Sequence, residues 1–337
     1  MKKIITIVKD LFRYFQIPQK EKNLTLFIEK ISDINYFNRF LIDLYKSLDL
    51  KVVILTSQII EDKKKINSNF EKEFIYIGSG LVRYLYFRFV NTKVFLMTTP
   101  DLENSELKKS INQVKYFYIF HSLASSHSIY NHNAFKHYDY ILSASPQHCR
   151  EIRYLEKLYK DKAKIVLPFG YPRILDLKKE YLDNSVNVKN KKTQKTILIA
   201  PTWGSSSITE TCLENLFQQL VLMNHKIIYR PHPISLSENK NYILKMKNKF
   251  RDKIIFENDI SKTNYLNYVD TLITDWSGFS LEFFFTTLKP TIFIDTPPKI
   301  KNKNFNDVKI EPIESVIRKK IGTIITIKDI KKINQKI

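Results

Sequence analysis

Short runs of apolar, β-branched and aromatic residues alternate with longer amphipathic segments from Leu24 onward. In the first half of the chain, the runs predict strands at Leu24–Ile28, Val52–Thr56, Phe74–Ile77, Val94–Met97, Val114–Phe120 and Tyr140–Ser143. Helical periodicity occurs between several of them, at Asn35–Leu48, Leu81–Val90, Leu102–Ile111 and Pro146–Tyr159. Strand and helix alternation of this kind predicts an α/β domain with a mostly parallel, doubly wound sheet.

A polar stretch rich in Asn and Lys interrupts the pattern at residues 183–195 and is typical of an exposed linker. The alternation then restarts, with strands predicted at Thr196–Ala200, Lys226–Tyr229, Ile254–Glu257, Thr271–Thr274 and Thr291–Ile294. The helices of this half are predicted around Thr209–Leu222, Asn239–Phe250, Lys262–Tyr268 and Ser280–Thr287. We therefore predict two doubly wound domains, residues 1–182 and 196–337, joined by the linker.

The opening segment, Lys2–Phe15, combines basic and apolar residues at roughly helical spacing. Such a helix either lies on an anionic membrane surface or packs against its own domain. The start lacks the apolar centre of a signal peptide, and no stretch approaches the roughly 18 apolar residues of a membrane span. Cys149 and Cys212 lie too far apart in sequence to support a disulfide framework or a cysteine zinc site. We expect a cytoplasmic protein.

The chain has 55 Lys and Arg residues against 34 Asp and Glu, which gives a formal net charge of +21. This excess favours anionic partners, which include nucleic acid, lipid headgroups and phosphorylated substrates. The alternative is that a biased composition places many lysines on solvated surfaces. Because no RRM, KH or zinc-finger signature is present, we expect no nucleic-acid partner.

Several predicted strands end in polar residues that are suited to chemistry. His121 and Ser122 follow the strand Val114–Phe120, and a histidine at a strand's carboxyl end is placed to deprotonate a hydroxyl. A purely structural, hydrogen-bonding histidine is the alternative, and His127 keeps that interpretation. Arg173 is the last residue of the sequence Gly-Tyr-Pro-Arg, which begins at Gly170 and precedes the linker. This segment is equally compatible with a hinge that places Arg173 near a cleft and with an ordinary turn.

Arg230 and His232 follow the strand Lys226–Tyr229 in the sequence Arg-Pro-His-Pro. An arginine offers a planar fork that matches phosphate oxygens, and the prolines fix the backbone on either side of His232. A turn with a surface ion pair is the structural alternative. Thr202 follows the strand Thr196–Ala200, where its hydroxyl and the ring of Trp203 are placed to contact a phosphate or a base.

Asp275, Ser277 and Gly278 follow the strand Thr271–Thr274 and precede a predicted helix. Small residues at a helix start leave backbone N–H groups free, and together with the helix dipole these groups bind phosphate. An ordinary N-cap is the structural alternative. Glu282, in the first turns of that helix, either holds a ribose hydroxyl or complements the dipole.

Several reaction classes lack their usual motifs. We find no Walker loop, no Gly-x-Ser-x-Gly elbow, no His-Glu-x-x-His helix and no carboxylate-rich metal triad. We therefore expect neither a metal nor a cofactor.

The polar segments that follow the predicted strands, taken in their order along the chain, resemble those of the CDP-glycerol glycerophosphotransferase family of teichoic acid and capsule synthesis. The resemblance runs from about Val114 to Pro290 and rests on the histidine after a strand, Gly-Tyr-Pro-Arg, Ala-Pro-Thr-Trp, Arg-Pro-His-Pro and Thr-Asp-Trp-Ser-Gly. It implies a GT-B fold and transfer of an alditol phosphate from a CDP-linked donor to a hydroxyl of a polysaccharide or lipid-linked acceptor. It also implies a peripheral position on the inner face of the cell membrane, with an anionic membrane surface as partner.

The resemblance also implies roles for single residues. His121 would deprotonate the acceptor, and Arg230 and His232 would hold the donor diphosphate as CMP leaves. The phosphate and donor contacts would come from Thr202, Ser277, Gly278 and Glu282, and the further cleft residues would be Ser122, Arg173 and Asp275.

The sequence departs from the family pattern at two places. The family commonly has Gly and Thr after the histidine, where this chain has Ser122 and Leu123, and a second serine where it has Gly278. These departures bear on the identity of the donor more than on the fold.

Three functions remain open on the sequence. The first is the phosphotransferase, with CMP release that depends on His121. The second is a GT-B glycosyltransferase that uses a CMP- or UDP-activated sugar for surface glycan synthesis. The third, which rests on the +21 charge alone, is a non-catalytic module that binds anionic polymer with strong salt dependence.

Overall fold

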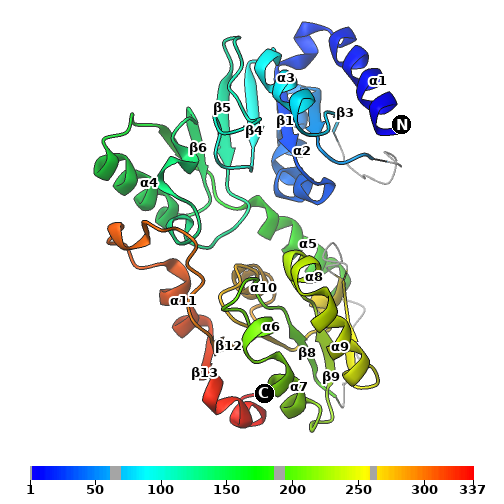
Figure 1. Cartoon of the computed structure of the whole chain (residues 1–337), viewed down its shortest axis with the longest axis vertical. Coiled ribbons are helices and arrows are strands. Elements are labelled where there is room, and N and C mark those ends of the chain that lie inside the picture. Colours follow the sequence, from blue (N-terminus) through cyan, green and yellow to red (C-terminus); the bar gives the residue numbers. More distant parts are fainter. Residues whose placement is uncertain (1, 61–69, 186–193, 259–263) are drawn as a thin grey trace. The chain divides into compact units, whose positions relative to one another are not determined.

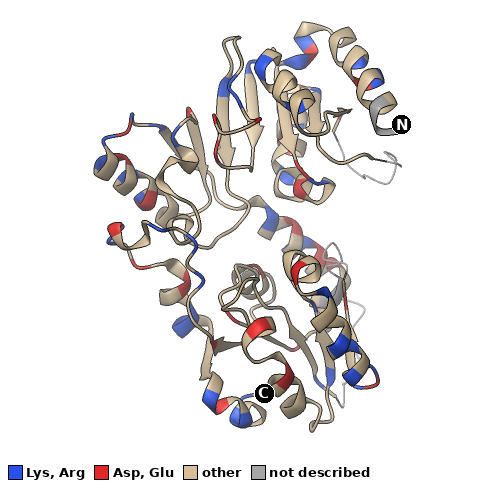
Figure 2. Cartoon of the chain, in the orientation of Figure 1, with Lys and Arg blue, Asp and Glu red and all other residues tan. Residues whose placement is uncertain are grey.

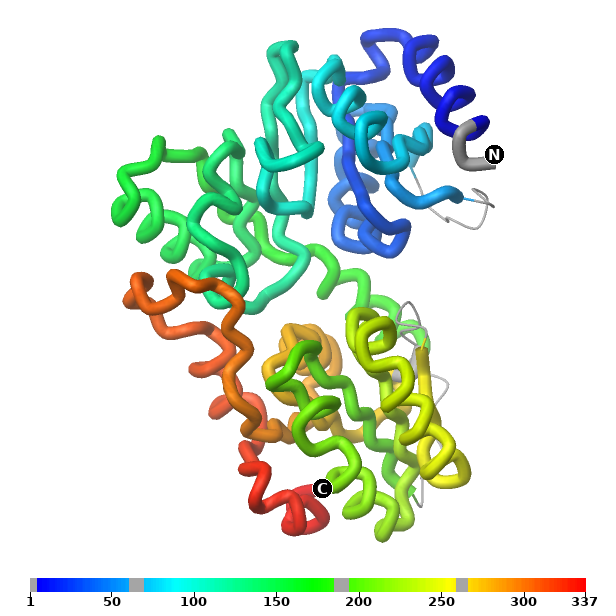
Figure 3. The backbone as a smooth tube through the Cα atoms, in the orientation of Figure 1, coloured from blue at the N-terminus to red at the C-terminus, as the bar shows by residue number. Residues whose placement is uncertain are grey.

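A computed structural model describes residues 2–60, 70–185, 194–258 and 264–337. Clustering of contacts divides the chain into two compact units (Figure 1). Unit 1 comprises residues 1–121, 130–173 and 306–308, and unit 2 comprises residues 122–129, 174–305 and 309–337. Figure 3 follows the chain through both units.

Unit 1 is built on a seven-stranded parallel sheet with the order β3-β2-β1-β4-β5-β6-β7. Its strands are β1 (Leu24–Ile28), β2 (Val52–Thr56), β3 (Lys72–Tyr76), β4 (Val94–Met97), β5 (Lys115–Ile119), β6 (Tyr140–Ser143) and β7 (Ile165–Pro168). Its helices are α1 (Lys2–Gln16), η1 (Gln19–Lys22), η2 (Ile31–Tyr36), α2 (Asn38–Leu48), α3 (Leu81–Phe89), η5 (His132–Phe135) and α4 (Pro146–Tyr159). Every residue of β1 and β2 is buried, as expected for central parallel strands covered on both faces.

Unit 2 has a six-stranded parallel sheet with the order β10-β9-β8-β11-β12-β13. Its strands are β8 (Thr196–Ile199), β9 (Lys226–Tyr229), β10 (Ile254–Phe256), β11 (Thr271–Thr274), β12 (Thr291–Asp295) and β13 (Gly322–Thr326). The remaining helices of the described chain are η4 (Ser126–Ser128), α5 (Pro172–Ser185), α6 (Ile208–Thr211), α7 (Leu213–Leu220), α8 (Pro233–Glu238), α9 (Lys240–Phe250), η6 (Asn264–Asn267), α10 (Phe279–Thr287), η7 (Phe305–Asp307), α11 (Ile313–Ile321) and η8 (Ile327–Gln335).

The two parallel sheets confirm the predicted fold class, and all eleven predicted strands are present with ends shifted by at most two residues. The sequence analysis did not predict β7, β13 or the helices α5, α8 and α11. Helix α5 clusters with unit 2 from Ile174 onward, and most of the predicted linker lies outside the described residues. The domain limits 1–182, 183–195 and 196–337 stay a prediction. The helix predicted from Lys262 is described only from Asn264, as η6.

The helix predicted at residues 102–111 is wrong. The segment is a folded loop in which Asp101, Glu103 and Ser105 have positive φ angles of 64°, 77° and 42°. The Glu103 backbone N–H donates to the Leu107 carbonyl at 2.8 Å, and the Glu103 carboxylate accepts from the backbone N–H of Lys109. Local bonds of this kind compete with the helical ladder, and a sequence of Asp, Asn and Ser favours them.

Helix α1 is present as predicted, but its apolar face does not provide its main packing. Asp10 and Tyr14 are buried against unit 1, and Asp10 accepts hydrogen bonds at 2.8 Å from the Tyr76 backbone N–H and from Arg13. The side chains of Ile5, Val8, Leu11, Phe12 and Phe15 are exposed. No helix in the described ranges is long and apolar enough to cross a membrane.

Candidate active site

In the sheet of unit 2, the strand order reverses between β8 and β11. Open α/β sheets bind their ligands at such switch points. Asp275 follows β11 and is 1% exposed. One of its carboxylate oxygens accepts from the Thr202 backbone N–H at 2.7 Å and the other from the Ile208 backbone N–H at 2.8 Å. Burial raises the pKa of Asp275, and these two hydrogen bonds oppose the rise. Asp275 thus fixes the loop after β8, so that its role is to position Thr202.

Arg230 follows β9 and is 9% exposed. Its backbone N–H donates to the Ile199 carbonyl at 2.8 Å, and its guanidinium lies 3.9 Å from the ring centroid of Phe279, the first residue of α10. A guanidinium stacked on an aromatic ring is held in a fixed plane. The Arg230 side chain therefore lies beside the start of α10, which follows the loop after β11.

His232 is the N-cap of α8, where its Nδ1 accepts from the Ile234 backbone N–H at 3.2 Å. Because an accepting Nδ1 carries no proton, the neutral ring carries its proton on Nε2. The His232 ring lies 6.1 Å from that of Trp203, in the loop after β8. Its Nε2–H is thus suited to donate to an anionic oxygen.

Lys299, which the sequence reading missed, lies in the loop after β12. Its ammonium donates to Thr202 Oγ1 at 3.0 Å and lies 4.2 Å from the Trp203 ring centroid. Burial lowers the pKa of Lys299 to about 8, although the charge of Asp275 acts in the opposite direction. Lys301 lies 4.8 Å from the same ring. The sequence offered one indication of a role for these lysines, namely that both follow the carboxyl end of β12, the strand that pairs with β11.

Ser277, Gly278 and Glu282 lie at the start of α10. Ser277 accepts hydrogen bonds through its carbonyl from the N–H of Ser280 at 3.1 Å and from the Ser280 hydroxyl at 2.8 Å. Gly278 faces Ser122, since a Cβ at position 278 would be 2.8 Å from Ser122 Oγ. Glu282 is half-buried in the first turn. The structure therefore brings Ser122 to this helix start, although the preceding residue, His121, belongs to unit 1.

His121 belongs to unit 1 and follows β5. Its Nδ1 is 3.2 Å from the Thr98 carbonyl oxygen, and its Nε2 is 3.3 Å from the Tyr130 hydroxyl. A carbonyl can only accept, so in the neutral ring Nδ1 carries the proton and the accepting lone pair is on Nε2. Burial raises the pKa of Tyr130 to about 12, which keeps this phenol protonated and able to donate to Nε2. In this tautomer, Nε2 is the accepting nitrogen and faces the Tyr130 hydroxyl.

Aromatic residues surround His121 in unit 1. The Tyr36 ring lies 5.8 Å from the imidazole, and the Tyr171 hydroxyl donates to the His121 carbonyl at 3.1 Å. Arg173 lies 5.4 Å above the Tyr36 ring. These contacts link Arg173 to the surroundings of His121, whereas the tyrosines were not identified from the sequence.

The candidate residues thus form two groups. His121 and Arg173 lie in unit 1, and the other eight candidates lie in unit 2 in the loops after β5, β8, β9 and β11 or on α10. A hydrogen bond links Thr202 to Asp275, and Ser122 lies against Gly278. Within the described part of the chain, no group of three or more His, Cys, Asp or Glu side chains is arranged to hold a metal ion.

The fold is similar to several solved structures. A UDP-GlcNAc 2-epimerase of Methanocaldococcus jannaschii in complex with UDP-GlcNAc and UDP aligns at a TM-score of 0.59 and 13% identity, covering 93% of this chain and 91% of that one. HepE of Anabaena in complex with UDP and glucose gives 0.52 and 8%, with 93% and 89% covered. A variant of the wall teichoic acid polymerase TagF soaked with CDPG gives 0.51 and 17%, with 87% and 78% covered. The two parallel sheets and these neighbours define a GT-B-like α/β protein.

The sequence itself matches a family model over most of its length. The model is described as CDP-Glycerol:Poly(glycerophosphate) glycerophosphotransferase and covers residues 107–333. A search of curated protein sequences finds no match. The chain therefore belongs to the CDP-glycerol:poly(glycerophosphate) glycerophosphotransferase family and is an enzyme of that family. The match confirms the resemblance and selects the phosphotransferase among the three functions that the sequence left open.

Proposed function

We propose that this enzyme transfers glycerol phosphate, or a similar alditol phosphate, from a CDP-linked donor to a hydroxyl of a cell-surface polysaccharide or lipid-linked acceptor. The observation that carries the proposal is the hydrogen bonding of His121. Its Nδ1–H is engaged by the Thr98 carbonyl, which leaves Nε2 as a base at the end of a strand. The acceptor hydroxyl takes the place of the Tyr130 hydroxyl as the hydrogen-bond donor to Nε2.

In the proposed reaction the acceptor oxygen attacks the phosphorus that bears the glycerol. A new oxygen–phosphorus bond forms, the bond to the CMP oxygen breaks, and His121 Nε2 receives the hydroxyl proton. Arg230, the Nε2–H of His232 and Lys299 hold the negative charge that develops as CMP leaves. Positioned donors and cations of this kind provide most of the catalysis in phosphoryl transfer.

The test measures CMP release from CDP-glycerol by the purified full chain, with a glycerol phosphate oligomer and a neutral disaccharide as separate acceptor probes. We expect His121→Ala to reduce the rate by about 100-fold or more, the loss typical of a missing general base, while CDP binding is retained. His137→Ala is the matched control, because His137 is an exposed histidine of the same unit. Arg230→Ala should weaken CDP binding. Turnover of a UDP- or CMP-activated sugar in place of CDP-glycerol would overturn the proposal.

We further propose that the enzyme lies at the inner face of the cell membrane, with α1 in contact with anionic lipid. Most of the large apolar side chains of α1 are exposed, with Phe12 66% and Phe15 65% exposed. Lys9 is exposed on the same helix. An amphipathic helix with this exposed face and a basic edge, in a chain of net charge +21, fits an anionic interface.

The neighbouring helix α3 supports the same role for this part of unit 1. The rings of Tyr14 and Tyr86 join the two helices at 5.6 Å. Leu81, Leu85 and Phe89, spaced four residues apart, are exposed along one side of α3. Figure 2 shows Lys and Arg along both helices. Together the two helices expose more large apolar side chains than isolated surface residues explain.

Co-sedimentation with vesicles tests the membrane proposal. We expect the full chain to sediment with phosphatidylglycerol vesicles and much less with phosphatidylcholine vesicles, and salt to weaken the binding. Phe12→Ser with Phe15→Ser should abolish sedimentation without loss of stability, because both rings are exposed. Leu222→Ser, at an exposed leucine of unit 2, is the matched control. Equal binding by both variants would refute a role for α1.

A further inference from the structure

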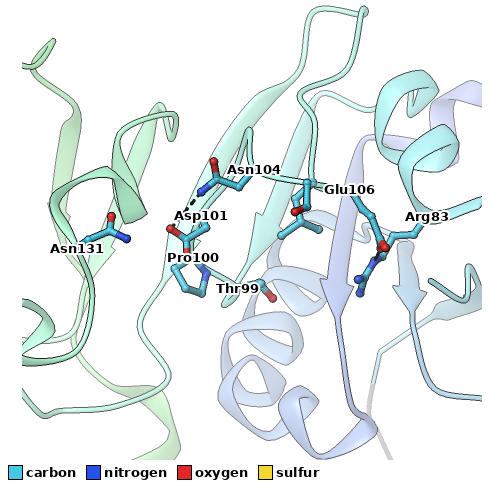
Figure 4. Close-up of a pocket in the computed structure, with 9 residues that line it drawn as sticks. Arg83, Thr99, Pro100, Asp101, Asn104, Glu106 and Asn131 are labelled. Atoms are coloured by element: carbon cyan, nitrogen blue, oxygen red, sulfur yellow. Dashed lines mark hydrogen bonds and ion pairs between the residues drawn. The ribbon is translucent and has the colours of Figure 1, made fainter. Parts of the chain in front are cut away.

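Unit 1 contains a cavity of about 550 Å³ that the candidate residues do not line. It lies beyond β4, where the strand order of the seven-stranded sheet reverses between β1 and β4. Figure 4 shows the side chains around it, which come from the loop after β4, from α3 and from the start of η5. The lining residues are Arg83, Thr99, Pro100, Asp101, Asn104, Ser105, Glu106, Leu107 and Asn131. A switch point is the usual ligand position in a sheet of this kind.

The loop that lines the cavity is held by its own backbone and by η5. The Asp101 N–H donates to the Ala134 carbonyl at 2.8 Å, and the Tyr138 hydroxyl donates to the Thr99 carbonyl. The Leu107 N–H donates to the Asn104 carbonyl at 2.9 Å, and Leu102 beneath the loop is 1% exposed. The cavity is therefore largely preformed, as most small-molecule sites are.

The charges around the cavity do not suit a phosphate. Arg83 is its one cation, and its Nε donates to Glu106 at 2.5 Å. Glu29, at the end of β1, is 3.7 Å from the same guanidinium. Among the described residues, no Lys or Arg side chain pairs with Asp101, which accepts from the Asn104 amide at 3.4 Å. Asp101 and Glu106 line the cavity together with Arg83, so the charged lining side chains carry a net negative charge, in contrast to the net charge of +21 for the chain.

The cavity adjoins the surroundings of His121. Thr99 lines it, and the preceding residue, Thr98, accepts the bond from His121 Nδ1. Asn131 lines it as well, next to Tyr130, whose hydroxyl meets His121 Nε2. A group bound in the cavity is therefore adjacent to the elements that orient the base.

We propose that this cavity binds the neutral, hydroxyl-rich saccharide or polyol part of the acceptor, and that it disfavours an acceptor with phosphate next to the reacting hydroxyl. Carboxylate, amide and hydroxyl groups such as those of Asp101, Asn104 and Thr99 are the hydrogen-bond partners of sugar hydroxyls. Carboxylates without a free cation repel phosphate at short range. The inference rests on the proposed function, since it assigns a site to the acceptor of that reaction.

The experiment compares two acceptor probes, a neutral alkyl disaccharide and a glycerol phosphate oligomer, in the CMP-release assay with the full chain. Asp101→Asn and Asn104→Ala should each raise the KM for the disaccharide about 10-fold, the loss expected for one charge-assisted or well-placed hydrogen bond. The KM for CDP-glycerol should stay unchanged. Asp101→Asn should lower the KM for the oligomer, because it removes a repulsive charge. Asn is chosen at position 101 because it tolerates the positive φ of 64°.

Asp43→Asn, at an exposed carboxylate of α2, is the matched control. Thermal unfolding of each variant establishes that the fold is intact. Unchanged KM for the disaccharide in both cavity variants would overturn the inference and leave the proposed function standing. Saturation-transfer NMR of the disaccharide with the wild-type chain needs no donor. Binding that Asp101→Asn weakens would therefore support the cavity even if CDP-glycerol were not turned over, whereas no binding would count against it.

Discussion

The contact between Gly278 and Ser122 predicts a specific coupling between these two positions. Gly278 has helical backbone angles, φ −60° and ψ −20°, so a side chain there is not excluded by the backbone. A Cβ would nevertheless lie 2.8 Å from Ser122 Oγ, where ordinary contact begins at 3.4 Å. In Gly278→Ala, the serine hydroxyl must therefore move by 0.6 Å or more (3.4 − 2.8) and strain its hydrogen bond from the Ala124 N–H at 3.2 Å.

The magnitude follows from two opposing effects. Overpacking costs about 1–3 kcal/mol, and a Gly to Ala change at a helical position returns about 0.4–1 kcal/mol through the unfolded state. We expect Gly278→Ala to lower the free energy of unfolding by about 1–2 kcal/mol. In a Ser122→Ala background, the nearest remaining side-chain atom is the Ala124 Cβ at 3.7 Å, so the same change should be neutral or stabilising.

Urea denaturation of the four proteins of this double-mutant cycle measures the coupling. Gly80→Ala is the control, because Gly80 has a φ of +66° and nothing within 4 Å of its Cβ position. Its cost arises from the backbone, and Ser122→Ala should not relieve it. A penalty for Gly278→Ala that is the same with and without the Ser122 hydroxyl would refute the reasoning. The two positions are also those at which the chain departs from the family pattern, and the contact gives that joint departure a steric cause.

Two further predictions concern unit 2. The affinity for CDP should fall as the pH rises through about 8, because burial lowers the pKa of Lys299 to about 8 and only its ammonium form attracts phosphate. Calorimetric titration of CDP across pH 6.5–9.5 measures this fall. It should be lost in Lys299→Met and kept in Lys301→Met. Asp275→Asn should destabilise the fold by about 1–3 kcal/mol in urea denaturation, because its amide cannot accept from both the Thr202 and the Ile208 backbone N–H groups.

The sequence was sufficient to predict the parallel sheets and the candidates of unit 2 because of one geometric rule. Parallel strands bring their carboxyl ends to the same edge of a sheet, so residues that follow different strands meet there. Thr202, Asp275 and Arg230 were identified in this way. Lys299 follows the rule as well, but it stands in a Pro-Pro-Lys sequence that carries no recognisable phosphate motif.

The aromatic surroundings of His121 could not be predicted in the same way. Tyr36 lies at the end of η2, and its ring reaches a histidine 85 positions further along the chain (121 − 36). Tyr130 lies in a loop after the histidine, and nothing in its neighbours marks it as the partner of Nε2. Side-chain contacts from loops and short 3-10 helices depend on tertiary packing, which has no periodic signal in the sequence.

Helix α1 shows what an amphipathic pattern leaves undecided. The pattern predicts a helix with an apolar and a polar side, but which side packs depends on partners elsewhere in the fold. Burying Asp10 would be costly without hydrogen bonds, and the Tyr76 N–H and Arg13 supply them. With the carboxylate satisfied, the helix is held by its polar side and by Tyr14. The helix thus packs against its own domain, as one of the two alternatives for α1 predicts, but it does so through Asp10 and Tyr14, and its apolar side with Phe12 and Phe15 is left outward.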